Sequence, residues 1–114
     1  MDHVTLINPF EVPTGKEDEF LERWKEAAAY LREQVGFVST RLHESLDPAA
    51  EFRFVNVAVW EPAEHFQRAL GTPEFQELAQ GMPFSGHPAL YRVISETSLV
   101  LPANDAIFGL LVLT

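Results

Sequence analysis

Hydrophobic residues along this 114-residue chain recur with two different periods, and the changes of period divide the chain into successive elements. Strand-like patterns, in which side chains alternate between two faces, predict strands over residues 3–12, 36–46, 52–60 and 89–100. Helical spacing of apolar residues predicts one helix over about residues 14–34 and a second helical region over residues 62–81, interrupted at Gly71. The predicted order is therefore strand, helix, strand, strand, helix, strand.

The ends of these elements carry their own signals. Thr14, with Glu17 three residues later, has the form of a capping box at the start of the first helix. In the second helical region Thr72 can cap a new helical segment, and Pro73 then occupies its first position. Pro9 has no N–H to donate within the first strand, which indicates a sheet edge or a bulge there.

This order of elements predicts an α+β, ferredoxin-like βαββαβ fold, an antiparallel sheet with its helices on one face. No helix is left to cover the other face, whose predicted residues are mostly apolar: Val38, Thr40, Leu42, Val55, Val57 and Val59. Such a face is typical of an interface, so we expect a homodimer that pairs sheet against sheet. Residues 1–98 are expected to form one domain, and residues 99–114 an apolar extension that adds a strand at the dimer interface.

Composition excludes several functional classes. The net charge is −9, from 17 acidic and 8 basic residues, which disfavours nucleic acid because phosphate binding needs clustered Lys and Arg. The chain has no cysteine, and its four histidines lack a metal-binding spacing, so no metal is expected. The sequence shows neither a signal peptide nor an apolar run of the roughly 20 residues that span a membrane. A cytoplasmic protein is expected.

The strand predicted over residues 52–60 carries a polar residue on its apolar face. Asn56 shares this face with Phe54, Ala58 and Trp60. A carboxamide among large apolar side chains must find hydrogen-bond partners or be costly to bury. Two interpretations are open: a core asparagine that bonds to a neighbouring backbone group, or a polar group inside an apolar pocket.

Residues of the first two strands are expected on the same side of the sheet. Phe37 suits a helix-covered core, and alternation from Phe37 carries Arg41 and His43 to that side. His43 would be the general base, since a histidine accepts a proton near neutrality, and Arg41 would hold the resulting anion. The alternative is that both lie at the open end of the strand, with Arg41 paired to a surface carboxylate. From the first strand, the expected lining residues are Leu6, Asn8 and Phe10.

Four stretches of the chain resemble the antibiotic biosynthesis monooxygenase family, whose members are small dimeric α+β barrels with ferredoxin-like subunits. These stretches are VTLINPFEVPTGKEDEFLERW, GFVSTRLHESLDP, FRFVNVAVWEPAEHF and HPALYRVI, and together they cover roughly residues 3–95. Cofactor-independent members that act in aromatic polyketide pathways hold the substrate with an Asn and a Trp four residues apart on the third strand. Asn56 and Trp60 match that pair, whereas Phe66 stands where those enzymes have a Tyr.

The resemblance implies a cofactor-independent monooxygenase that acts on an aromatic, polyketide-like phenol or enol, with dioxygen as co-substrate and no cofactor. Haem-degrading members share Asn8, but their haem-ligating His and their distorting Trp would fall near Ala79 and Ala69, so haem ligation of that kind is not expected. Two alternatives are open. One is a non-oxidative polyketide cyclase or isomerase that uses the same pocket, and the other is a non-catalytic module that binds a small molecule.

Overall fold

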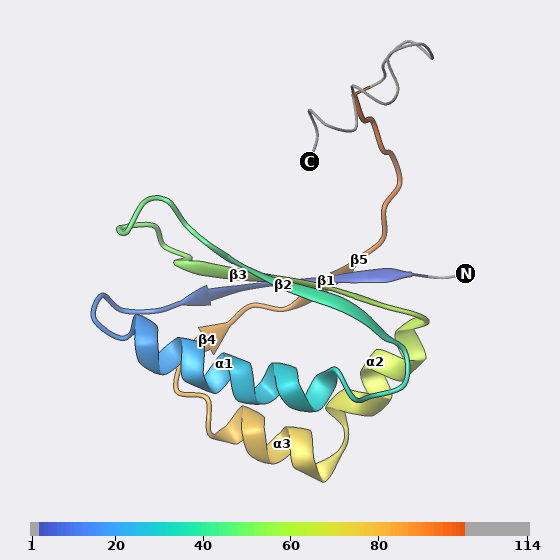
Figure 1. The fold of residues 1–114 in the computed structure, drawn as a ribbon, viewed down its shortest axis with the longest axis horizontal. Helices are drawn as coiled ribbons and strands as arrows, with labels where there is room; N and C mark the ends of the chain where they lie inside the picture. Colours follow the sequence, from blue (N-terminus) through green and yellow to red (C-terminus); the bar gives the residue numbers. More distant parts are fainter. Residues whose placement is uncertain (1–2, 100–114) are drawn as a thin grey trace, which may run out of the picture.

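One antiparallel sheet with three helices on a single face makes up residues 3–99, the part of the chain described by the computed structural model (Figure 1). The strands are β1 (Val4–Glu11), β2 (Phe37–Glu44), β3 (Phe54–Trp60), β4 (Ser85–Gly86) and β5 (Ala89–Tyr91). The helices are α1 (Glu17–Leu31), α2 (Ala63–Leu70) and α3 (Pro73–Gln80). The strand order is β2-β3-β1-β4, and β5 also pairs with β1. This is the predicted ferredoxin-like fold, with the last strand in two short pieces.

The helix starts follow the local sequence signals only in part. Helix α3 begins as predicted, because the Thr72 hydroxyl accepts a hydrogen bond from the Phe75 N–H at 3.2 Å. Helix α1 begins at Glu17, and the predicted capping box at Thr14 is wrong. Instead Gly15 takes a φ of 93°, which favours glycine, and its N–H donates to Glu17 Oε1 at 2.8 Å. None of the helices in residues 3–99 is long and apolar enough to cross a membrane.

Two clusters of buried apolar side chains hold the helices against the sheet. Phe20 and Trp60 are the most deeply buried residues, at 0% and 1% exposure, and each anchors one cluster. The Phe20 ring stacks on Phe54 with 4.8 Å between ring centroids. Residues of both clusters line a cavity between the sheet and the helices.

Strand β2 contains a bulge that the sequence pattern did not reveal. Phe37 pairs with Trp60 on β3 and Ser39 pairs with Val59, so the register shifts and Val38 has no partner. One inserted residue turns every later side chain of a strand to the opposite face. The alternation counted from Phe37 is therefore reversed from residue 39 onward.

The bulge exchanges the faces of β2. Thr40 and Leu42 lie on the helix side of the sheet, although the outer face was predicted for both. Arg41 and His43 lie on the outer face, where Arg41 pairs with Val57. The outer face is consequently apolar along β3, as predicted, and polar along β2.

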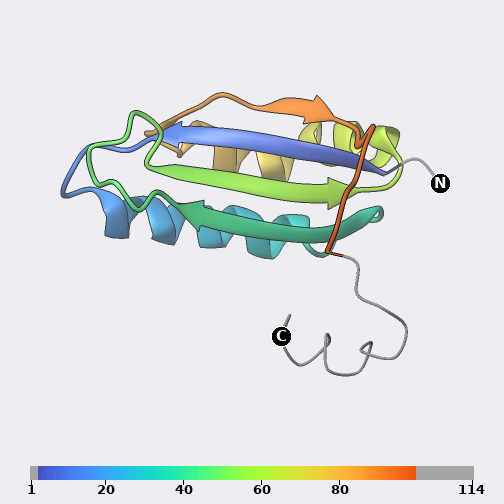
Figure 2. The same ribbon diagram turned by 90° about the horizontal axis from the view of Figure 1, so that it is seen from above.

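The last strand is shorter than predicted, since only Ala89–Tyr91 of the predicted range pairs with β1. Residues 92–99 form no strand and leave the sheet on the face opposite the helices (Figures 1 and 2). Pro9 lies opposite the gap between β4 and β5. Strand β1 has partners on both sides and an unbroken register with β3, so the edge or bulge predicted at Pro9 is wrong. Of the predicted extension, residues 100–114 lie outside the described residues.

Candidate functional site

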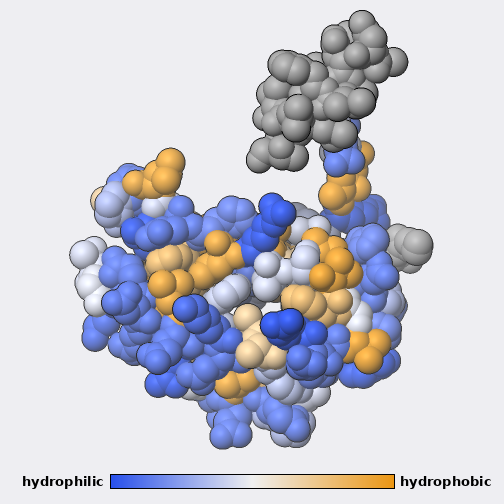
Figure 3. All heavy atoms as spheres, viewed as in Figure 1, coloured by the Kyte–Doolittle hydropathy of each residue, from blue (hydrophilic) through white to orange (hydrophobic). Residues whose placement is uncertain are grey.

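A cavity of about 340 Å³ lies between the inner face of the sheet and the three helices. Strands β1, β2 and β3 form its floor, and α1, α2, α3 and the segment 82–88 form the other walls. Apolar atoms are visible between the sheet and the helices, bordered by hydrophilic residues (Figure 3). A volume of this size is within the range of small-molecule pockets, which are usually apolar with a few oriented polar groups.

Three polar side chains contribute to the cavity lining: Asn8, Thr40 and Asn56. The lining contains no Asp, Glu, His, Lys or Arg from the described part of the chain. A molecule in this cavity therefore meets carboxamide and hydroxyl groups, but no charged side chain of residues 3–99.

Asn56 lies in the floor of the cavity, at the middle of β3. Its Oδ1 accepts a hydrogen bond from the Thr40 hydroxyl on β2 at 2.6 Å. No backbone group of the described residues bonds to the Asn56 side chain, so the interpretation as a core asparagine bonded to the backbone does not hold. The position of Asn56 in the cavity floor agrees with the other interpretation, a polar group inside an apolar pocket.

Asn8 lies next to Asn56, because the two residues pair directly between β1 and β3. Its Oδ1 is buried and has no hydrogen-bond partner within residues 3–99. Gly86 makes this close packing possible: a Cβ at Gly86 would lie 2.8 Å from Asn8 Oδ1 and 2.9 Å from Phe10 Cε1. An unpaired buried acceptor costs about 1–3 kcal/mol, so Asn8 Oδ1, packed against Gly86, is a destabilising feature of this part of the floor.

Aromatic rings form one end of the cavity. Trp60 packs edge-on against Phe37, with 5.4 Å between ring centroids, and against Phe66 at 5.5 Å. Phe66 therefore adds a ring and no hydroxyl to this wall. Most of the site residues named from the sequence line the cavity: Leu6, Asn8, Phe10, Asn56, Trp60 and Phe66.

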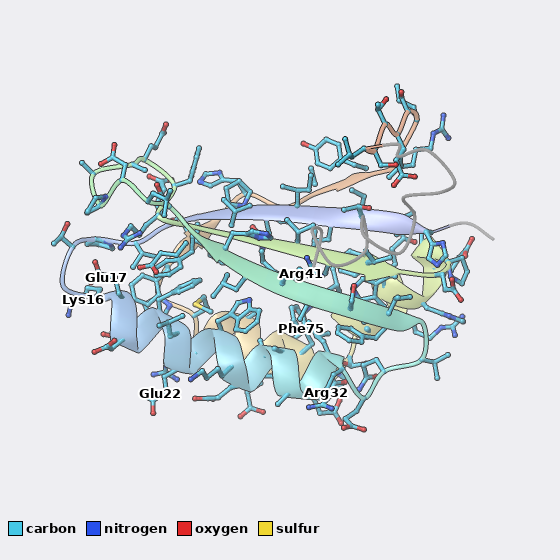
Figure 4. All side chains as sticks on the ribbon, turned by 45° about the horizontal axis from the view of Figure 1, so that its top comes forward. Lys16, Glu17, Glu22, Arg32, Arg41 and Phe75 are labelled. Carbon is cyan, nitrogen blue, oxygen red and sulfur yellow. The ribbon has the colours of Figure 1, made fainter. Side chains whose placement is uncertain are left out.

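Arg41 and His43 do not line the cavity, and the positions predicted for them are wrong. Both are exposed on the outer face, where His43 Nδ1 lies 3.3 Å from the Val55 carbonyl oxygen. Figure 4 shows Arg41 on β2, on the far side of the sheet from the helices, and Phe75 between the sheet and the helices. The bulge in β2 is the cause, because it reverses the face of every residue after Val38.

Sequence reasoning missed Thr40 and the wall formed by α3. Phe75, Leu78 and Met82 face the cavity from this helix and the turn after it. Their spacing of three and four residues is helical, and this signal could have identified an inward face. For Thr40 no such signal exists, since its face depends on the bulge.

Ionisable groups near the rim form pairs outside the cavity. His87 Nε2 lies 2.7 Å from Glu11 Oε2, and His3 pairs with Glu61. Within residues 3–99, no group of three or more His, Asp or Glu side chains could hold a metal ion.

The fold and the site define a small α+β protein with a largely apolar cavity between its sheet and its helices. Residues 3–81 match the sequence profile of the antibiotic biosynthesis monooxygenase family, and the chain belongs to this family. The deoxynogalonate monooxygenase of Streptomyces nogalater is 38% identical over 74 residues, which are 65% of this chain and 60% of that enzyme. The matched segment thus spans less than two thirds of that enzyme.

Solved structures extend the similarity over most of the described fold. SnoaB, a cofactor-independent oxygenase from Streptomyces nogalater, is 31% identical with a TM-score of 0.75, over 84% of this chain and 97% of SnoaB. An asparagine-to-alanine variant of SnoaB gives a TM-score of 0.76 at 30% identity. A protein from Shewanella loihica PV-4, provisionally named a monooxygenase, is 39% identical with a TM-score of 0.74, over 83% of this chain and 97% of that one.

Proposed function

We propose that this protein is a cofactor-independent monooxygenase that oxidises an aromatic, polyketide-like phenol or enol with dioxygen. The observation that carries the proposal is the cavity floor, where Asn8 and Asn56 lie side by side and the buried Trp60 lies on the same strand as Asn56. Membership of the family supports the monooxygenase class. The similarity to SnoaB, a cofactor-independent oxygenase, supports chemistry without a cofactor.

The proposed substrate is a flat molecule of fused rings. The cavity of about 340 Å³ has aromatic walls from Trp60, Phe37, Phe66 and Phe75, which favour stacked or edge-on contacts with aromatic rings. The carboxamide of Asn56 would orient the polar edge of the substrate by donating a hydrogen bond to one of its oxygens. Orientation of this kind restricts the reacting carbon to one position relative to dioxygen.

The reaction begins when the phenol or enol loses a proton. No ionisable side chain of residues 3–99 lines the cavity, so the proton goes to water, and His43 on the outer face is not its acceptor. Asn56 N–H groups stabilise the resulting oxyanion among the apolar side chains of the cavity, where a hydrogen bond to a charge is stronger than in water. The protein thus favours the ionised, electron-rich form of the substrate.

Oxidation follows from this anion. The anion passes one electron to dioxygen, which gives a substrate radical and superoxide, and the two combine to a carbon–oxygen bond. The peroxide takes up a proton, and loss of water from the carbon that carries it leaves a carbonyl. A methylene and dioxygen have then become a carbonyl and water, with one oxygen atom in each product.

Oxygen uptake by the chelator-treated protein tests the proposal. Anthrone without added flavin should be consumed with one equivalent of dioxygen, faster than in samples without protein or with heat-denatured protein. With labelled dioxygen, one labelled atom should enter the product. Uptake that requires added iron or flavin would contradict the proposal, and turnover under strict anaerobiosis would favour the cyclase or isomerase alternative.

A homodimer is the second part of the proposal, and it rests on the outer face of the sheet. Val55, Val57 and Val59 lie on this face. The segment after β5 leaves on the same side with Val93 and Ile94 exposed by 73% and 89%. Apolar side chains in this arrangement favour self-complementary pairing about a two-fold axis. A cytoplasmic location and the lack of a nucleic-acid partner stay predictions from composition.

A further inference from the structure

We propose that Thr40 is a positioning residue, whose hydroxyl fixes the carboxamide of Asn56 so that the Nδ2 donors face the cavity. The inference rests on the proposed function, in which the cavity binds an oxyanion. Thr40 would not contact the reacting atoms itself, and it would act only through Asn56.

The hydrogen bond between the two side chains sets the orientation. Thr40 Oγ1 donates to Asn56 Oδ1 at 2.6 Å, a short separation for a hydroxyl donor. A carboxamide has an acceptor end and a donor end, and a half turn of the group exchanges them. Since the acceptor end is bonded to Thr40, the donor end points away from Thr40.

The donor end is open to the cavity. Within residues 3–99, the buried side-chain nitrogen and oxygen atoms that lack a partner are Asn8 Oδ1 and Arg53 Nε. Asn56 Nδ2 makes no hydrogen bond to the described residues and is not one of these sealed atoms, so it remains accessible. Because Asn56 lines the cavity, that access is through the cavity.

The β2 bulge gives this hydroxyl its position. The register shift between Phe37 and Ser39 places Thr40 on the helix side, where it pairs with Ala58 and reaches Asn56 diagonally. With regular alternation, Thr40 would face outward and Arg41 would point at the apolar cavity. The bulge thus brings a neutral donor to Asn56 and keeps a charged side chain out of the site.

Removal of the hydroxyl should free the carboxamide. In Thr40→Val the shape is retained, but nothing prevents the Asn56 oxygen from turning toward the cavity, where it would repel an oxyanion. Thr40→Ser keeps the donor and should behave as the wild type. Thr5→Val makes the same chemical change on the outer face of β1, opposite Val59, and serves as the matched control.

Alizarin, a hydroxyanthraquinone whose absorbance changes on ionisation, reports the state of a bound phenol without turnover. Bound to the wild type, it should ionise at lower pH than in Thr40→Val. The expected difference is about one to two pH units, the loss typical of one hydrogen bond to a charged oxygen. Thr40→Ser and Thr5→Val should match the wild type. Equal midpoints in the wild type and Thr40→Val, or a Thr40→Ser midpoint equal to that of Thr40→Val, would overturn the inference.

Kinetics give an independent comparison. Thr40→Val should lower kcat for oxygen uptake about tenfold or more, and it should have no further effect in an Asn56→Ala background, since the two residues act as one unit. Additive losses would overturn the inference. Absence of oxygen uptake by the wild type would contradict the proposed oxygenase function, while the alizarin midpoints would still decide the role of Thr40.

Discussion

Replacement of Asn56 by alanine should separate the contribution of this residue to stability from its contribution to turnover. Within the described residues, its side chain makes one hydrogen bond, to Thr40, and it borders an existing cavity. A hydrogen bond between neutral groups contributes about 0.5–1.5 kcal/mol net, and enlarging a cavity that already exists adds little. We therefore expect the free energy of unfolding to fall by about 1 kcal/mol.

Turnover should fall much more. If the Nδ2 group of Asn56 stabilises the oxyanion, its loss resembles the removal of one oxyanion-hole donor, which lowers kcat about 10²–10³-fold, or about 2.7–4 kcal/mol. The effect on the transition state is then roughly three times the effect on folding. If Asn56 had only a structural role, its replacement would instead lower the free energy of unfolding more than it affects turnover.

Urea unfolding and oxygen uptake, measured on the same preparation, compare the two effects. Ser39→Ala, an exposed polar change on the outer face of β2, is the control and should alter neither quantity. A loss of more than about 3 kcal/mol in unfolding free energy, together with unchanged kcat, would refute the reasoning, because such a loss marks a buried structural group.

Four further changes test other parts of the structure. Trp60→Ala, at a residue 1% exposed, should lower the free energy of unfolding by about 3–5 kcal/mol in urea titrations, and a loss below about 1 kcal/mol would contradict the packing. Val57→Lys, at the centre of the outer face, should dissociate or aggregate the homodimer in sedimentation experiments; a well-folded wild-type monomer at micromolar concentration would be the contrary result. His43→Ala should leave the pH profile of kcat/KM unchanged, since the profile should follow the ionisation of the substrate, and a profile that changes would restore a catalytic role. Gly86→Ala should displace the Asn8 carboxamide and lower kcat, whereas unchanged kinetics would show that the close contact is not needed.

Strand β3 could be predicted because only one phase of its alternation buries its aromatics. Phe54, Ala58 and Trp60 are all buried, and Asn56 lies on the same face with them. Burial of large rings is worth enough free energy to decide the register without ambiguity. The position of Asn56, the central feature of the site, followed from this strand.

Strand β2 could not be predicted in the same way. Beyond Val38 its sequence STRLHE has no dominant apolar face, so one aromatic, Phe37, fixed the predicted phase of the whole strand. A bulge at Val38 needs no special residue type and left no mark in the pattern. Because the predicted face of β2 was wrong, Arg41 and His43 were placed in the cavity, and His43 was assigned as the base.

The prediction of the last strand was wrong for another reason. Residues 92–99 have a sequence that suits a strand, but they pair with no strand within residues 3–99. A strand forms only where a neighbouring strand is available for hydrogen bonding. The sequence indicates the β-propensity of a segment but not whether such a neighbour exists. The end of β5 at Tyr91 is where pairing with β1 stops.

Both tryptophans of the chain, Trp24 on α1 and Trp60 on β3, line the cavity. The indole fluorescence of the protein therefore comes entirely from walls that an occupant of the cavity would touch. A fused-ring quinone that absorbs in the range of indole emission would quench this light by energy transfer while it is bound. Filling and emptying of the cavity could then be followed in real time without a label, which would distinguish the departure of product from the preceding chemical step.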